Sequence, residues 1–144
     1  MKNKIYNDME CPISKCLEHV GEWWSILIIR DVFRGLKRFD EFQKSLGIST
    51  NMLTRRLKEL VETGILEKQN YGQSQNRFEY VLTEKGLGLS SVLITMAEWG
   101  NKYDTNNNSK SSIINIKTKE IAEPILIDKK TGLEITSENY EVVL

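Results

Sequence analysis

The chain has 144 residues, of which 40% are hydrophobic and 28% are charged. This composition is typical of globular proteins and argues against a disordered or membrane-spanning chain, and the length fits one domain with a short extension. The 20 basic and 20 acidic residues give a net charge of zero, which argues against a protein that coats nucleic acid through a global positive field.

The charges are distributed unevenly along the chain. Residues 30–58 contain eight basic and three acidic residues, a net charge of +5, whereas residues 111–144 carry a net charge of −2. Such an asymmetry favours one nucleic-acid-binding face on an otherwise balanced protein.

The N-terminal residues have no apolar core after their lysines, and no apolar run is long enough to span a bilayer. These features predict a cytoplasmic protein without a signal peptide or membrane anchor. The two cysteines, Cys11 and Cys16, suit a reducing compartment. A bridge between them is not expected, because five helical positions separate their Cα atoms by more than about 7 Å along the axis.

The first three predicted elements are helices. Residues 12–20 form a short helix with Pro12 at its first position, where the missing N–H costs nothing. Residues 23–33 are apolar on nearly every side and predict a helix in the domain centre. Residues 39–46 form a third helix, with Gly47 as a left-handed cap.

Residues 49–63 have the pattern of a recognition helix. Leu53, Leu57 and Leu60 recur at helical spacing and predict a buried face. Ser49 or Thr50 is the expected N-cap. The opposite face carries side chains suited to guanine, adenine and phosphate contacts, namely Asn51, Thr54, Arg55 and Lys58. The alternative is an ordinary solvated helix face.

A hairpin and a long helix are predicted next. Strand-like residues 65–68 and 77–82 flank a polar loop, and residues 71–77 of this "wing" offer Gln73–Asn76 and Arg77 to the DNA backbone or minor groove. Thr83 is the expected N-cap of a helix over residues 84–103. The apolar surface of that helix exceeds what a small core can bury and predicts a partner subunit.

The C-terminal part is predicted to be an appendage. Residues 105–112 are a polar linker, and residues 113–144 form a small β-hairpin-like extension around the turn sequence at 128–132. The extension contains no cysteine or histidine, so no zinc site is expected there. No phosphate-binding glycine loop, metal-ligand spacing or nucleophile–base set is recognised elsewhere, so we expect neither a cofactor, a metal nor an enzyme activity.

Residues 11–103 resemble the HxlR-type branch of the MarR-like winged helix-turn-helix transcriptional regulators. The resemblance rests on Cys11-Pro12, Arg38-Phe39, Leu53-Thr54-Arg55-Arg56-Leu57, Leu82-Thr83 with Gly86, and Trp99-Gly100. It implies a mainly α domain over residues 1–104 with a small β wing, and a homodimer formed through the first and last domain helices. It also implies that the recognition helix and wing carry the DNA-contacting residues Ser49, Thr50, Thr54, Arg55, Arg56 and Arg77.

These observations predict a homodimeric regulator, acting as a repressor, that binds an inverted repeat in double-stranded DNA. The alternative is a winged-helix protein-interaction module without specific DNA binding. Cys11 lies beside a helix N-terminus, which favours a thiolate, and is either an oxidant or electrophile sensor or an unreactive packed residue. Trp23, Trp24 and Trp99 are interpreted as core residues, with a pocket for a small-molecule effector as the alternative.

Overall fold

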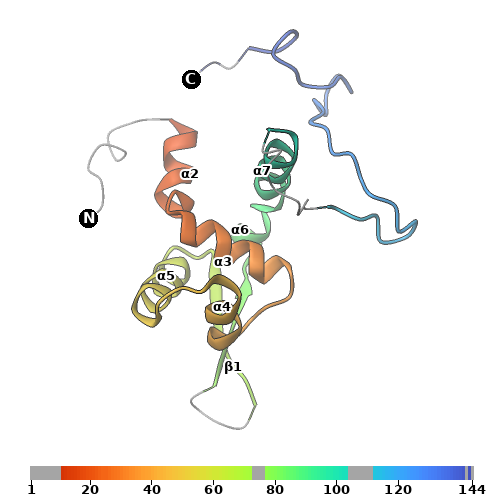
Figure 1. Cartoon of the computed structure of the whole chain (residues 1–144). Coiled ribbons are helices and arrows are strands. Elements are labelled where there is room, and N and C mark those ends of the chain that lie inside the picture. The colour runs from red at the N-terminus through yellow and green to blue at the C-terminus, as the bar shows by residue number, and fades with distance from the viewer. Residues whose placement is uncertain (1–10, 73–76, 104–111, 142, 144) are drawn as a thin grey trace. The chain divides into compact units, whose positions relative to one another are not determined.

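The computed structural model describes residues 11–72, 77–103, 112–141 and 143 (Figure 1). The chain divides into two compact units, residues 1–90 and 91–144. This division assigns most of the last domain helix to the C-terminal unit.

From residue 11, where the description of the first unit begins, four helices follow one another: α2 (Pro12–Val20), α3 (Trp23–Phe33), α4 (Phe39–Leu46) and α5 (Thr50–Glu62). The predictions for residues 12–20, 23–33 and 39–46 are therefore confirmed. Gly47 ends α4 with a φ of 62°, the left-handed conformation expected of a glycine cap. The turn between α4 and α5 is short, so the two helices form a helix-turn-helix.

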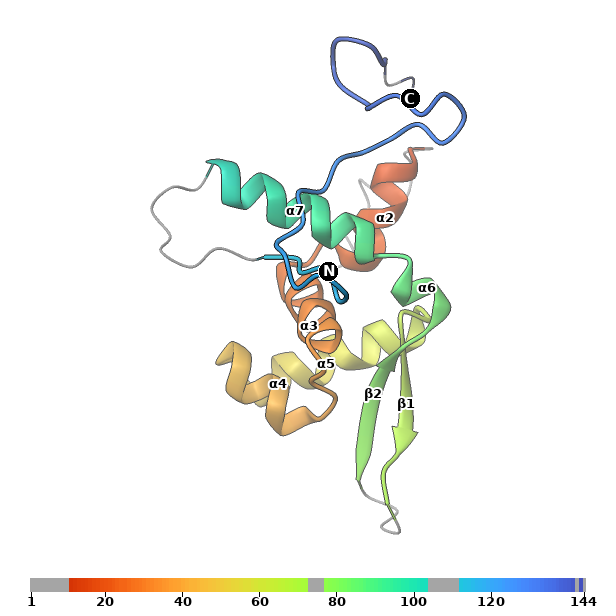
Figure 2. The same ribbon diagram turned by 90° about the vertical axis from the view of Figure 1, so that its right-hand side faces the viewer.

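A two-stranded antiparallel hairpin follows α5. Its strands are β1 (Leu66–Asn70) and β2 (Phe78–Leu82), paired from Leu66 opposite Leu82 to Asn70 opposite Phe78. Figure 2 shows the hairpin extending away from the helices, as the wing of a winged helix does. The Tyr80 N–H donates to the Lys37 carbonyl over 2.8 Å and fastens the wing to the segment between α3 and α4.

The core of the first unit lies where these elements meet. Ile28 and Ile29 of α3 are fully buried, as are Phe42 of α4 and Leu53 and Leu57 of α5. The predicted apolar face of residues 49–63 is therefore confirmed. Burial of apolar side chains at about 25 cal/mol per Å² is the dominant force that fixes α5 against α3 and α4.

The predicted helix over residues 84–103 is wrong as one element. The structure has a single turn, α6 (Glu84–Leu87), and then α7 (Ser90–Tyr103). Thr83 caps α6 as expected, because its Oγ accepts from the Gly86 N–H at 3.1 Å. Gly86 and Gly88 each make a continuous helix less stable by about 1 kcal/mol relative to alanine. The chain turns here, and Leu89 is buried.

The second unit contains α7 and the C-terminal extension. No residue of α7 is buried. Between residues 112 and 141 there is no regular strand, only isolated bridges that join Ile114 to Ile121 and Ile127 to Glu134. At the turn sequence of residues 128–132, where a hairpin is predicted, the antiparallel bridge between Ile127 and Glu134 flanks the turn without regular strands. Pro124, which has no N–H to donate to a ladder, lies between the two bridges.

The interpretation of the tryptophans as core residues is wrong for two of the three. Trp23 is 72% exposed and Trp99 is 66% exposed. Both lie at apolar positions of helices, where hydrophobic periodicity indicates an apolar face but not what covers that face.

None of the helices in the described part of the chain is long and apolar enough to cross a membrane.

Candidate nucleic-acid interface

The start of α5 is held by its own hydroxyl groups. Ser49 is the N-cap, and its Oγ accepts from the Met52 N–H at 3.4 Å. The Thr50 Oγ accepts from the Gln43 side-chain amide of α4 at 2.9 Å. Both hydroxyls are therefore engaged in fixing the position of α5, and both residues are exposed at its N-terminal end.

The exposed face of α5 carries four of the predicted DNA-contacting residues: Asn51, Thr54, Arg55 and Lys58. It lies opposite the buried leucines, so the same helix packs through one side and presents polar groups on the other. The Thr54 hydroxyl donates to the Thr50 carbonyl at 2.8 Å, and its oxygen keeps capacity to accept.

The two cations of this face form ion pairs with carboxylates one turn away. The Arg55 Nε lies 3.4 Å from Glu59, and the Lys58 Nζ lies 3.7 Å from Glu62. All four side chains are substantially exposed. Exposed pairs of this spacing contribute only about 0.3–0.5 kcal/mol, so either cation can exchange its carboxylate for a phosphate or a base at small cost.

Arg56 departs from the prediction that it contacts DNA. Its side chain is only 5% exposed, and its guanidinium lies 2.8 Å from Glu22 and 2.6 Å from Glu59. Glu22 is the N-cap residue of α3, so Arg56 joins α5 to the start of α3. The helical position of Arg56, between Leu53 and Leu60 on the packed side, accounts for this burial. Arg56 is therefore not part of the exposed face.

The wing contributes Arg77, which is exposed just before β2. Its carbonyl accepts from the Tyr71 N–H at 2.7 Å, which closes the described part of the hairpin. The predicted contacts from Gln73–Asn76 lie outside the described residues. Of the wing residues predicted to contact DNA, Arg77 is the one that lies among the described residues.

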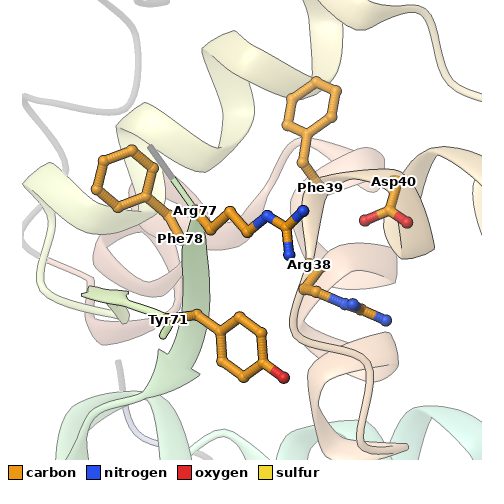
Figure 3. A pocket seen from close by; sticks show the side chains of 6 residues that line it. All are labelled: Arg38, Phe39, Asp40, Tyr71, Arg77 and Phe78. Carbon is orange, nitrogen blue, oxygen red and sulfur yellow. The ribbon is translucent and has the colours of Figure 1, made fainter. Parts of the chain in front are cut away.

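A hollow of about 400 Å³ lies between the loop end of the β1–β2 hairpin and the start of α4. Figure 3 shows the Arg77 side chain reaching from the wing toward α4, with its guanidinium beside residues 38–40. The lining comprises Arg38, Phe39, Asp40, Tyr71, Arg77 and Phe78. Sequence reasoning did not place Arg38 in the binding surface, although the Glu three residues later was a visible capping signal.

Arg38 is held in place by Glu41. The Glu41 carboxylate accepts from the backbone N–H groups of Lys37 and Arg38 at 2.8 and 2.9 Å. It also accepts from the Arg38 Nε and Nη2 at 3.2 and 2.9 Å. These bonds stabilise the charged carboxylate and lower the pKa of Glu41 to about 2, while the hydrogen bond to Glu41, together with its charge, raises the pKa of Arg38.

Cys11 is the N-cap residue of α2 and is half-buried. Its carbonyl accepts from the Ser14 hydroxyl at 2.9 Å, while its thiol makes no capping bond. Cys11 and Cys16 are both free thiols. Within the part of the chain that the structure describes, no three His, Cys, Asp or Glu side chains are grouped as a metal site requires.

A family model for HxlR-like helix-turn-helix proteins matches residues 19–108. The chain belongs to the HxlR-like helix-turn-helix family. An uncharacterized HTH-type transcriptional regulator from Mycobacterium bovis is 36% identical over 128 residues, covering 88% of this chain and 81% of that one. The relatives of this family are regulators rather than enzymes, and this HxlR-like chain is a transcriptional regulator with a helix-turn-helix domain.

Solved structures share the fold. The crystal structure of PA1607, described as a candidate transcription factor, is 33% identical with a TM-score of 0.85 and covers 96% of this chain and 98% of its own. The redox regulator HypR in its oxidized form is 34% identical with a TM-score of 0.59 and covers 69% of this chain and 100% of its own. The predicted winged helix-turn-helix fold is confirmed, and PA1607 is similar over the C-terminal extension as well.

Proposed function

We propose that this HxlR-like protein is a sequence-specific repressor that binds an inverted repeat in double-stranded DNA as a homodimer. Helix α5 enters the major groove, and the wing at residues 71–77 contacts the backbone or the minor groove. The observation that carries the proposal is the division of α5 into a buried leucine face and an exposed face of Asn51, Thr54, Arg55 and Lys58. Reaching chromosomal DNA requires a cytoplasmic location.

The roles of the exposed residues differ by chemistry. Arg55 is suited to bidentate contact with guanine, and Asn51 to adenine, so both are proposed base-reading residues. Lys58 and Arg77 are proposed phosphate contacts. Ser49 and Thr50 are proposed backbone contacts at the N-terminal end of α5, where exposed hydroxyl and N–H groups meet phosphates.

Substitution of two cations on one helix face tests this assignment. Arg55→Ala is expected to cost about 1–3 kcal/mol at one operator position and to relax specificity there, since it removes a base contact. Lys58→Ala is expected to weaken binding to all sequences and to lower the salt slope by about one, since it removes a phosphate contact. Titration of fluorescent duplexes at several salt concentrations measures both. If neither substitution changes affinity, the protein-interaction alternative is favoured.

Two helices support the proposed homodimer. Val92, Met96, Trp99 and Tyr103 recur on one side of α7, and each is at least 37% exposed. Ile13 and Leu17 form an exposed pair on α2, at 57% and 45%. Apolar faces of this kind on helices mark protein–protein contacts, and a second copy of the chain supplies the same faces in a two-fold arrangement.

Cys11 is the proposed sensor of oxidants or electrophiles. Its support is its place at the N-terminus of α2, its partial exposure and the similarity to the redox regulator HypR. Affinity for the operator should fall on treatment with diamide in the wild type and stay constant in Cys11→Ser. Equal responses of both proteins would exclude Cys11 and direct the search to a small-molecule effector.

A further inference from the structure

The hollow between the loop end of the hairpin and α4 has features of an anion site that the recognition-helix assignment does not use. Its lining combines residues 38–40 at the start of α4 with Tyr71, Arg77 and Phe78 from the two sides of the wing. Two of these residues are arginines, and aromatic rings form much of the remaining wall (Figure 3).

The two walls are held together by contacts other than the arginines. The Tyr80 N–H donates to the Lys37 carbonyl at 2.8 Å. The rings of Phe42 in α4 and Tyr80 in β2 meet edge to face with centroids 6.3 Å apart. These contacts hold β2 against α4 before any ligand binds, which lowers the entropic cost of binding.

The arginines retain unused donors. Arg38 uses its Nε and Nη2 toward Glu41 and keeps its Nη1 group. Among the described residues, no carboxylate lies within ion-pair distance of Arg77. Asp40, on the rim, is the opposing charge of the hollow.

We propose that this hollow binds one phosphodiester of the DNA backbone, through Arg77 and Arg38, with Glu41 as the positioning residue that fixes Arg38. A phosphodiester offers two acceptor oxygens that share one negative charge, and the two arginines supply guanidinium donors from two different elements. The site would set the distance from the wing to α5 on the duplex. This inference rests on the proposed DNA-binding function and extends its contact surface to the start of α4.

Substitution of Asp40 is expected to change DNA affinity in the opposite direction from substitution of the two arginines. A carboxylate on the rim repels a bound phosphate, so Asp40→Asn should strengthen binding at low salt. The general field of the DNA gives the same signs without a bound phosphate, so the methylphosphonate experiment, and not the sign of the Asp40→Asn effect, assigns the contact to the hollow.

The test uses the full chain and a duplex selected from a random library. Arg38→Gln and Arg77→Gln should each weaken binding about tenfold and each lower the salt slope by about 0.9. Glu41→Gln should weaken binding in the wild type but add nothing to Arg38→Gln. Lys15→Gln removes the same charge from an exposed position on α2, outside the hollow, and should change little.

Methylphosphonate substitution locates the phosphate. One neutralised position should weaken wild-type binding about tenfold and have no further effect on the Arg38→Gln variant, because both changes remove the same contact. Independent, additive losses at every position would overturn the proposal. A second result would also overturn it: inorganic phosphate shifts the arginine NMR signals of the hollow, but no methylphosphonate position affects DNA binding. The hollow would then be a site for a free anion.

Failure of this inference is distinguishable from failure of the proposed function. If wild-type protein selects no duplex, both fail. If it selects a duplex and Arg55→Ala weakens binding while Arg38→Gln and Arg77→Gln do not, the phosphate site and the role of Arg77 as a phosphate contact are refuted, whereas the role of α5 in the major groove stands.

Discussion

At the scale of single residues, neighbouring arginines of α5 have opposite roles. Arg55 is 53% exposed and Arg56 is 5% exposed, because a shift of one position turns a helical side chain by about 100°. The sequence pair alone resembles a doubly basic DNA contact. The packing of α5 on α3, where the Arg56 guanidinium lies 2.8 Å from Glu22, shows that Arg56 has a structural role, whereas Arg55 stays exposed.

Arg56→Ala is predicted to lower the free energy of unfolding by about 1–3 kcal/mol, because it removes a buried side chain with two ion pairs. Arg55→Ala should stay within about 0.5 kcal/mol, as exposed substitutions do. Urea denaturation of both variants measures the difference. Equal stability of the two would contradict the structural role of Arg56.

Glu41 predicts a pH dependence of stability. Because the folded state lowers its pKa from 4.5 to about 2, the charged carboxylate stabilises the fold above pH 4.5, and this contribution is lost as the pH falls toward 2. Thermal unfolding of wild type and Glu41→Gln should differ most above pH 4.5 and converge on acidification. A difference that is independent of pH would show that Glu41 acts by packing alone.

At the scale of the elements, helices were predictable from the sequence and their interruptions were not. The spacing of Leu53, Leu57 and Leu60 and the cap at Gly47 are local signals, and both are confirmed. The break after α6 depends on tertiary contact: the Gly86 backbone packs directly against Ile65 and Leu82. In the extension, alternating isoleucines indicate strands without showing whether a partner strand exists, and the structure has isolated bridges there.

Gly86→Ala should destabilise the fold by about 1–3 kcal/mol, because the added methyl group would overlap the Ile65 carbonyl oxygen. Gly100→Ala is the matched control. It lies in α7 with nothing within 4 Å of the added carbon and should be neutral or stabilising, since alanine is the better helix former. Comparable losses in both variants would contradict the close approach at Gly86.

At the scale of the whole molecule, the proposed dimer explains the exposed apolar side of α7. Met96→Glu should place a charge in that interface, convert the dimer to monomer and reduce operator affinity. Asn101→Glu, on the opposite side of α7, should preserve the dimer. Analytical ultracentrifugation distinguishes them, and a Met96→Glu protein that remains dimeric would remove α7 from the interface.

The central claim is that α5 of this HxlR-like regulator reads a specific duplex as one half of a dimer. Selection from a random duplex library under reducing conditions tests it most directly. The expected result is an inverted repeat with half-site centres one helical turn apart, about 34–36 Å, or a multiple of it, and relaxed at one position per half-site by Arg55→Ala. Failure to enrich any sequence, or enrichment of a single unrepeated site, would contradict the account.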